Sequence, residues 1–167
     1  NLDGVVHHIP GGSAPATSVG VHFISLPKLL EVVLFNGFDK RTGRQVFAPH
    51  NLPLCSYDEI WEAFKIYFSR SVELLTLTNN IQHDAWRKIT PSLVNSMLKP
   101  DCLLKGKDIG QQGSRYNRTF NVEICGGVNL VNSLASIKLN VFEKQNFSLQ
   151  TLKEARSEEH TSELQSR

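Results

Sequence analysis

The sequence predicts an α/β protein, because two strand patterns alternate with amphipathic helix patterns along its 167 residues. The stretch GVHFIS, residues 20–25, is short and apolar, as a buried strand would be. The stretch RTFNVEI, residues 118–124, alternates apolar and polar side chains, as a half-buried strand would. The runs between and after them carry apolar residues at helical spacing. This order of elements fits one domain or a piece of a larger one.

The chain is expected to begin with a loop, because residues 1–20 are rich in Gly, Ser, Pro and Ala. A helix follows the first strand. Ser25 is placed to cap that helix, and Pro27 fits its first turn. Asn36 and Gly37 form a fitting stop signal, because both residue types tolerate the left-handed backbone that ends many helices.

The middle of the chain is expected to hold a turn, a long helix and a second buried segment. DKRTGRQ, residues 39–45, has the composition of a solvated turn. Ser56 and Glu59 have capping-box spacing and open a long amphipathic helix, which continues or kinks before Pro91. SLVNSML, residues 92–98, predicts a buried strand or extended piece.

The last third of the chain is expected to hold a loop, the second strand and two helices. Residues 98–109 predict the loop, and Gly126 and Gly127 end the strand. Ser148 fits the cap of a final helix. Between these lies a helix over residues 129–143, whose apolar stripe is Leu130, Leu134, Ile137 and Val141.

Composition excludes several classes of function. The net charge of +2 indicates neither a nucleic-acid partner nor a membrane surface. No apolar run approaches the roughly 18 residues of a membrane span, and no secretory signal is visible. The three cysteines, Cys55, Cys102 and Cys125, are odd in number and lack metal-ligand spacing. They predict reduced, partly buried thiols in a cytoplasmic protein without a metal site.

The two ends of the sequence indicate a fragment. The chain begins with Asn1 rather than Met. The last twelve residues, RSEEHTSELQSR, resemble the in-frame translation of a common sequencing-adapter oligonucleotide. We therefore expect residues 1–155 to form a partial domain and residues 156–167 to be a non-native tail without packed structure.

The glycine-containing stretch DIGQQGSRYN, residues 108–117, invites a phosphate-binding interpretation, which its spacing rejects. A Walker loop needs a lysine followed by Ser or Thr directly after its last glycine, and Gly110 and Gly113 precede Gln111 and Ser114. A dinucleotide fingerprint opens a helix, whereas this stretch leads into a strand. No nucleotide site is predicted.

Glu123 and His22 are the candidate site residues. Pattern alone leaves Glu123 open between a solvated carboxylate and a site residue near the Gly-Gly break, where backbone often approaches a ligand. A carboxylate at a strand end can serve as an acid, a base or a substrate partner. His22, flanked by Val21 and Phe23, is by pattern a core histidine. The remaining histidines are expected in loops or on a helix surface: His7, His8, His50 and His83.

Three stretches in this order, SLPKLLEVVLFNGFDKRTGRQV, PDCLLKGKDIGQQGSRYN and GGVNLVNSLASIKLNVFE, resemble the pyruvate formate-lyase-like domain of glycyl radical enzymes. The resemblance covers nearly all of residues 21–155. It implies an incomplete segment of a ten-stranded α/β barrel. The motif positions that carry it are Asn36-Gly37, Asp39, Thr42-Gly43, Asp101-Cys102, Gly113 to Asn117 and Asn129 to Lys138.

The resemblance also implies radical chemistry, in which a backbone glycine stores a radical and passes it to a cysteine that attacks the substrate. Neither carrier has its motif in this sequence, and Gly126 and Gly127 do not match the radical glycine. The fragment alone is therefore expected to be inactive and to hold no cofactor. The full-length family uses a glycyl radical installed by an S-adenosylmethionine iron–sulfur activating enzyme. A homo- or hetero-oligomer is implied, with a small iron–sulfur subunit as a further candidate partner.

His22 and Glu123 indicate the branch of the family, because the arylacetate decarboxylases carry a histidine and a glutamate at the matching positions. By this resemblance Glu123 is catalytic, and both residues bind the substrate. The implied reaction removes CO2 from a 4-hydroxyphenylacetate-like aryl acid and leaves a cresol. The alternatives are a choline trimethylamine-lyase, a diol dehydratase, a formate acetyltransferase, a benzylsuccinate-type enzyme, or a non-catalytic module that uses the same barrel segment.

Overall fold

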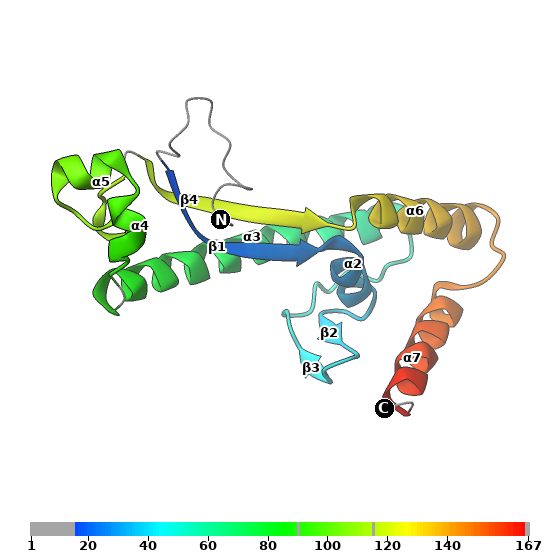
Figure 1. Cartoon of the computed structure of the whole chain (residues 1–167). Helices are drawn as coiled ribbons and strands as arrows, with labels where there is room; N and C mark the ends of the chain where they lie inside the picture. Colours follow the sequence, from blue (N-terminus) through cyan, green and yellow to red (C-terminus); the bar gives the residue numbers. More distant parts are fainter. Residues whose placement is uncertain (1–15, 90, 115, 166–167) are drawn as a thin grey trace. The chain divides into compact units, whose positions relative to one another are not determined.

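In the computed structural model, the chain is rich in helices and has few strands (Figure 1). Its backbone is described over residues 16–89, 91–114 and 116–165. The chain forms two compact units. The first consists of Asn1–Phe23 and Val72–Glu123, and the second of Ile24–Ser71 and Ile124–Arg167.

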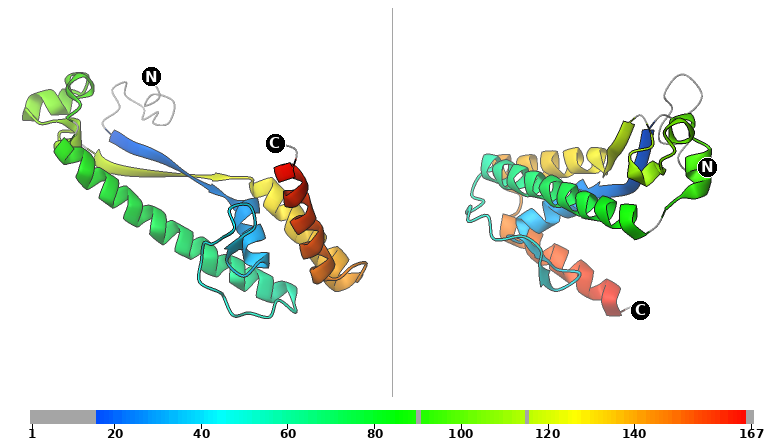
Figure 2. Two further views of the ribbon diagram at one scale, coloured as in Figure 1. Left: turned by 90° about the horizontal axis from the view of Figure 1, so that it is seen from below. Right: turned by 90° about the vertical axis from the view of Figure 1, so that its left-hand side faces the viewer.

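The two predicted strands pair with each other. Strand β1 spans Ala16–Ser25 and strand β4 spans Tyr116–Cys125, and they are neighbours in a two-stranded sheet. Both arrows run in the same direction (Figure 1 and Figure 2), so the pairing is parallel. The loop prediction for residues 16–20 is therefore wrong, because β4 supplies a pairing partner that local composition does not reveal. Residues 1–15 of that predicted loop lie outside the described part of the chain.

Helix α2, Leu26–Leu34, follows β1 directly and is buried on most of its surface. Pro27 occupies the first turn, as predicted, but the Ser25 side chain makes no capping hydrogen bond. Full burial of a Leu or Val side chain stabilises a fold by about 1.5–3 kcal/mol. The helix is therefore a main source of core in its unit. Its buried apolar residues are Leu26, Leu29, Leu30, Val32, Val33 and Leu34.

Helix α6, Gly127–Ile137, packs against α2 and continues as a π-helical stretch, Lys138–Glu143. The predicted apolar stripe is confirmed, because all four of its residues are buried: Leu130, Leu134, Ile137 and Val141. The 3.6-residue period of this segment was therefore sufficient to identify its buried face.

The predicted turn after α2 is a β-hairpin. Strand β2, Phe38–Asp39, pairs antiparallel with β3, Arg44–Gln45. The Asp39 carboxylate organises the turn, since it accepts hydrogen bonds from the Arg41 backbone N–H at 3.0 Å and the Thr42 hydroxyl at 2.8 Å. It also forms an ion pair with Lys28 at 2.7 Å.

These contacts give a pH dependence to the stability of the second unit. Burial raises the pKa of Asp39, but the hydrogen bonds from Lys28, Thr42 and Arg41 outweigh it and hold the pKa at about 2, below the usual 3.8. A carboxyl with a lowered folded-state pKa contributes stability above its unfolded pKa and loses it as the pH falls through the folded pKa.

We therefore expect the unfolding free energy of the chain to fall by about 1–2 kcal/mol between pH 4 and pH 2 through Asp39. Asp39→Asn should lower the unfolding free energy by a similar amount at pH 7, and its unfolding free energy should no longer show this fall between pH 4 and pH 2. Urea denaturation followed by circular dichroism across the pH range measures both effects. Asp58→Asn is the control, because Asp58 is an exposed carboxylate on another element, and this variant should keep the fall between pH 4 and pH 2. If the unfolding free energy of Asp39→Asn fell between pH 4 and pH 2 as much as that of the wild type, the role of Asp39 would be contradicted.

Helix α3 spans Tyr57–Ile89 and continues to Ile89 without a break, one of the two alternatives left by the sequence. The predicted capping box is present in altered form. The Glu59 backbone N–H donates to the Ser56 hydroxyl at 3.3 Å, whereas the Glu59 carboxylate accepts from the Cys55 backbone N–H at 2.6 Å. The carboxylate thus reaches one residue beyond the capping position and still satisfies a backbone donor before the helix.

Two predictions in the first unit are wrong. Residues 92–98, predicted as a strand, contain the short helix α4, Leu93–Met97. Residues 98–109, predicted as a loop, contain the helix α5, Pro100–Lys105. The apolar residues Leu93, Val94 and Met97 are 69%, 72% and 67% exposed. The continuous apolar run predicts a buried strand or extended piece, but here it forms a helix whose apolar side chains are not covered by other described residues.

Asp108 explains why this segment folds back into a helical hairpin. Its carboxylate accepts hydrogen bonds from the Ser92 backbone N–H at 2.8 Å, the Ser96 hydroxyl at 2.7 Å and the Gly110 backbone N–H at 2.7 Å. Ser96 is itself buried and accepts from the Ile109 backbone N–H at 2.9 Å. The carboxylate thus joins the start of α4 to the short 3-10 helix Ile109–Gln111.

Helix α7, Leu149–Gln165, corrects the expectation of an unstructured tail. The Ser148 cap is confirmed, since its hydroxyl accepts from the Thr151 backbone N–H at 3.0 Å. The helix continues through most of the adapter-like residues, and Arg156 forms an ion pair with Glu31 on α2 at 2.9 Å. Glu, Leu and Gln are good helix formers, so this stretch extends an existing helix although it lacks an apolar stripe.

Candidate functional site

The structure places the two predicted site residues on neighbouring strands. His22 lies on β1, three residues before its end at Ser25, and Glu123 lies on β4, two residues before its end at Cys125. Because the strands are parallel, both positions lie toward the carboxyl edge of the sheet. In α/β folds, ligands bind beyond the carboxyl ends of the strands. The backbone therefore brings the two residues to the edge where a site is expected. The His22 side chain lies outside the described side chains.

The end of β4 is open to solvent on both faces. Glu123, Ile124 and Cys125 are all exposed, and successive residues of a strand point to opposite faces. The half-buried pattern predicted for residues 118–124 therefore fails at Ile124, whose side chain is 55% exposed. On β1, Phe23 beside His22 is 62% exposed. A substrate or another part of a larger protein can reach the Glu123 carboxylate from this edge.

Each of these strands passes directly into a helix, and the two junctions touch. Strand β1 leads into α2, whose first turn holds Pro27, and β4 leads through Gly126 into α6. Gly126 has φ +78°, a left-handed conformation that glycine adopts without cost. A Cβ at this position would lie 2.7 Å from Cδ of Pro27, so the two junctions are packed as closely as glycine permits.

The stretch that first suggests a phosphate loop has a packing role. Gly113 is buried against Cys102, and a Cβ at Gly113 would lie 2.7 Å from the Cys102 sulfur. The two motif elements Asp101-Cys102 and Gly113 to Asn117 therefore occur together because the glycine of one packs on the cysteine of the other. Cys102 is 2% exposed. Burial raises the pKa of its thiol, and the nearby Asp108 carboxylate adds to this effect, so the thiol stays protonated and inert.

The other two thiols are exposed, which corrects the prediction of three partly buried cysteines. Cys55 precedes α3 and Cys125 ends β4, and all three cysteines are free. Within the described ranges, no cluster of three or more His, Cys, Asp or Glu side chains is arranged to hold a metal ion. Among the same residues, no helix has both the length and the hydropathy to cross a membrane.

His50 is a structural residue that the sequence did not reveal. It lies in a loop, as expected, but it is half-buried and its ring centroid lies 5.6 Å from that of Tyr67. Its Nδ1 accepts from the Leu52 backbone N–H at 3.0 Å, so Nε2 carries the proton and donates to the Val33 carbonyl at 3.1 Å. His50 thus ties the loop before α3 to α2. No local sequence signal marks a histidine for such long-range contacts.

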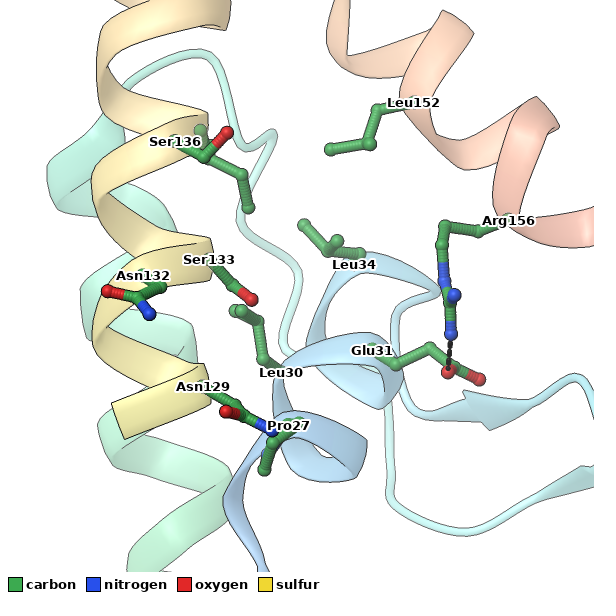
Figure 3. Close-up of a pocket in the computed structure, with 11 residues that line it drawn as sticks. Pro27, Leu30, Glu31, Leu34, Asn129, Asn132, Ser133, Ser136, Leu152 and Arg156 are labelled. Atoms are coloured by element: carbon green, nitrogen blue, oxygen red, sulfur yellow. Dashed lines mark hydrogen bonds and ion pairs between the residues drawn. The ribbon is translucent and has the colours of Figure 1, made fainter. Parts of the chain in front are cut away.

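A hollow of about 570 Å³ lies between α2, α6 and α7 (Figure 3). Leu30 and Leu34 face Ser133 across it, and the Glu31–Arg156 ion pair lies at its side. Neither His22 nor Glu123 lines it. The Glu31 carboxylate is already engaged by Lys28 at 2.7 Å and by Arg156, which is the first of the adapter-like residues and lines the hollow from α7 together with Leu152. We therefore place the candidate site at the strand edge.

Comparison with known proteins gives a consistent result. The family model described as pyruvate formate lyase-like matches residues 5–165. The chain is 50% identical over 153 residues to the 4-hydroxyphenylacetate decarboxylase glycyl radical subunit of Clostridium scatologenes, covering 92% of this chain and 17% of that protein. It is 34% identical over 137 residues to the trans-4-hydroxy-L-proline dehydratase of Clostridioides difficile, covering 80% of this chain and 17% of that protein.

A solved structure shows the same fold. The crystal structure of hydroxyproline dehydratase from Clostridioides difficile, with its substrate bound, superposes with a TM-score of 0.70 at 32% identity. The match covers 80% of this chain and 17% of the other. The chain therefore spans about 17% of the length of the relatives it matches.

Proposed function

The chain belongs to the pyruvate formate lyase-like family of glycyl radical enzymes, and on this premise we propose that it is part of a decarboxylase of 4-hydroxyphenylacetate-like aryl acids. The observation that carries the proposal is the placement of His22 and Glu123 near the carboxyl ends of two paired parallel strands. A carboxylate and an imidazole at one sheet edge can bind and deprotonate a phenol.

Sequence similarity supports this branch over others in the family. The chain shares 50% of its residues with a 4-hydroxyphenylacetate decarboxylase subunit but 34% with a hydroxyproline dehydratase. The same fold hosts several reactions, so the choice rests on the site residues as well as on overall identity.

The proposed roles follow from the chemistry of the substrate. The net reaction converts the arylacetate carboxylate and one proton into CO2 and a methyl group on the ring. The phenolic hydroxyl becomes more acidic as the ring takes on radical character, so a carboxylate beside it gains by accepting that proton. We assign the proton acceptor to Glu123, and we assign to His22 a hydrogen bond that holds the substrate.

No described residue of this chain has the surroundings expected of the radical glycine or of the attacking cysteine. Gly126 is engaged in the contact with Pro27, and Cys102 is buried among its packing partners. Cys55 lies before a helix and Cys125 at a strand end, and neither lies at the tip of a loop. We assign the radical glycine and the attacking cysteine to other parts of the full-length enzyme, and we expect the isolated chain to be inactive.

The remaining features of the full-length enzyme follow from the same proposal. We expect a ten-stranded α/β barrel to which residues 1–155 contribute one segment, and we place residues 156–167 outside the natural domain. The partners we propose are an S-adenosylmethionine iron–sulfur activating enzyme and further subunits, including a small iron–sulfur subunit. The relatives named as a glycyl radical subunit support an enzyme of several subunits. We place this enzyme in the cytoplasm, in keeping with its three free cysteines.

A second candidate is a dehydratase of the same family. It is favoured by the TM-score of 0.70 to hydroxyproline dehydratase, whose structure was solved with trans-4-hydroxy-L-proline bound. The two candidates differ in product, because a dehydratase removes water and a decarboxylase releases CO2.

Product analysis of the activated full-length enzyme distinguishes them. The enzyme would be incubated anaerobically with 4-hydroxyphenylacetate and, in separate reactions, with trans-4-hydroxy-L-proline and choline. We expect cresol and CO2 in equal amounts from the first substrate and no turnover of the others. Trimethylamine, an aldehyde or a dehydrated amino acid without any cresol would overturn the decarboxylase assignment.

A further inference from the structure

The two adjacent glycines after β4 differ in whether their position requires glycine. Gly126 has φ +78°, and a Cβ there would lie 2.7 Å and 2.8 Å from Cδ and Cγ of Pro27. Gly127 needs no left-handed backbone, and a Cβ there would meet nothing within 4 Å. Only Gly126 is therefore required to be glycine, both by its conformation and by the approach of the Pro27 ring.

The contact lies close in sequence to both proposed site residues. Gly126 follows Glu123 by three residues, and Pro27 follows His22 by five. Extended chain advances about 3.3 Å per residue and does not stretch. The helices that begin at these junctions, α2 and α6, pack on each other through buried apolar residues. Strand β1 ends at Ser25, directly before α2, and β4 ends at Cys125, directly before Gly126, so each proposed site residue lies on a strand that leads into this contact.

We propose that Gly126 is a positioning residue, which sets the spacing between the carboxyl ends of β1 and β4 and thereby the position of Glu123 relative to His22. This inference rests on the proposed function. Ordinary contact between carbon atoms is at about 3.5–4.0 Å. A methyl group at Gly126 would therefore have to push the junctions apart by about 1 Å, and a displacement of that size at an active site can cost about a hundredfold in rate.

The test uses four variants of the full-length enzyme, activated and assayed anaerobically with 4-hydroxyphenylacetate. Gly126→Ala should lower kcat about ten- to hundredfold, and the glycyl radical content measured by electron paramagnetic resonance should stay at the wild-type level. Gly127→Ala is the matched control and should keep the wild-type kcat. Pro27→Ala should lower kcat about threefold, because it removes the ring that Gly126 packs against. The double variant Gly126→Ala/Pro27→Ala should recover at least about threefold over Gly126→Ala, because the new methyl group occupies the space left by the ring.

The outcomes separate the inference from the proposed function. If the wild type forms no cresol, the proposed function fails, and the variants are then compared on the substrate that the wild type does turn over. If the wild type is active, a normal kcat in Gly126→Ala, or a loss that Pro27→Ala does not relieve, overturns the positioning role. Should Gly126→Ala fail to fold or to accept the radical, Pro27→Ala decides alone, and an unchanged kcat there overturns the role.

Discussion

Glu123→Gln is expected to lower kcat/KM for 4-hydroxyphenylacetate at least tenfold in the activated full-length enzyme. The amide has the size of the carboxylate but cannot accept the phenolic proton, and general-base catalysis typically contributes about 10²–10⁴-fold. Glu123 is exposed at the end of β4, so the substitution leaves the packing of the described residues unchanged. Steady-state cresol formation, with the glycyl radical quantified in each sample, measures the effect.

The matched control is Glu143→Gln, because Glu143 is also exposed and lies outside the proposed site on the π-helical stretch after α6. We expect this variant to keep the wild-type kcat/KM. If Glu123→Gln were as active as Glu143→Gln at equal radical content, Glu123 would have no part in the proton transfer.

Gly37→Ala is expected to cause the largest loss of stability, about 3 kcal/mol. Gly37 has φ +88°, and left-handed backbone costs an alanine about 1–2 kcal/mol. A Cβ there would lie 2.6 Å from Nε2 of Gln45 and 2.9 Å from the Tyr67 hydroxyl, and it would overlap the Phe47 carbonyl oxygen. Overpacking of this kind costs a further 1–3 kcal/mol or so.

The contacts around Gly37 explain why its neighbours cannot easily move away. The Gly37 carbonyl accepts from the backbone N–H groups of Val46 and Phe47 at 2.8 Å and 3.2 Å. The Tyr67 hydroxyl donates to the Ala48 carbonyl at 2.9 Å, and its ring stacks on Phe47. Displacing any one of these groups breaks a hydrogen bond or a ring contact in the buried face between the hairpin and α3.

Gly43→Ala provides the matched control for Gly37→Ala in urea denaturation. Gly43 has φ +68°, but a Cβ there would meet nothing within 4 Å. Its loss should therefore come from backbone strain alone, at about 1–2 kcal/mol. Equal losses in the two variants would show that the close approach at Gly37 contributes nothing.

The elements that the sequence predicted correctly have signals within their own segments. The apolar stripe of α6, the Asn36-Gly37 stop and the serine caps at Ser56 and Ser148 are all local features, and each is present in the structure. The helical hairpin over residues 92–109 was missed because it depends on Asp108, whose partners lie up to 16 residues away. A periodicity argument cannot detect such a contact.

The candidate site likewise has features that the sequence could predict and features that only the structure shows. The identities of His22 and Glu123 came from resemblance to a family, since pattern alone left one as a core histidine and the other open between a solvated carboxylate and a site residue. The structure adds that their strands are neighbours, which no local pattern could establish because the pairing joins distant segments. The close approach of Gly126 to Pro27 was equally invisible, since the sequence marked the two glycines only as a strand break.

A structure of the full-length enzyme with 4-hydroxyphenylacetate bound is the most direct test of the central claim that His22 and Glu123 form one substrate site. We predict that the phenolic oxygen lies within about 3 Å of the Glu123 carboxylate, as proton transfer requires, and that the His22 imidazole donates a hydrogen bond to the same ligand. A substrate bound elsewhere, with neither side chain in contact with it, would contradict the account.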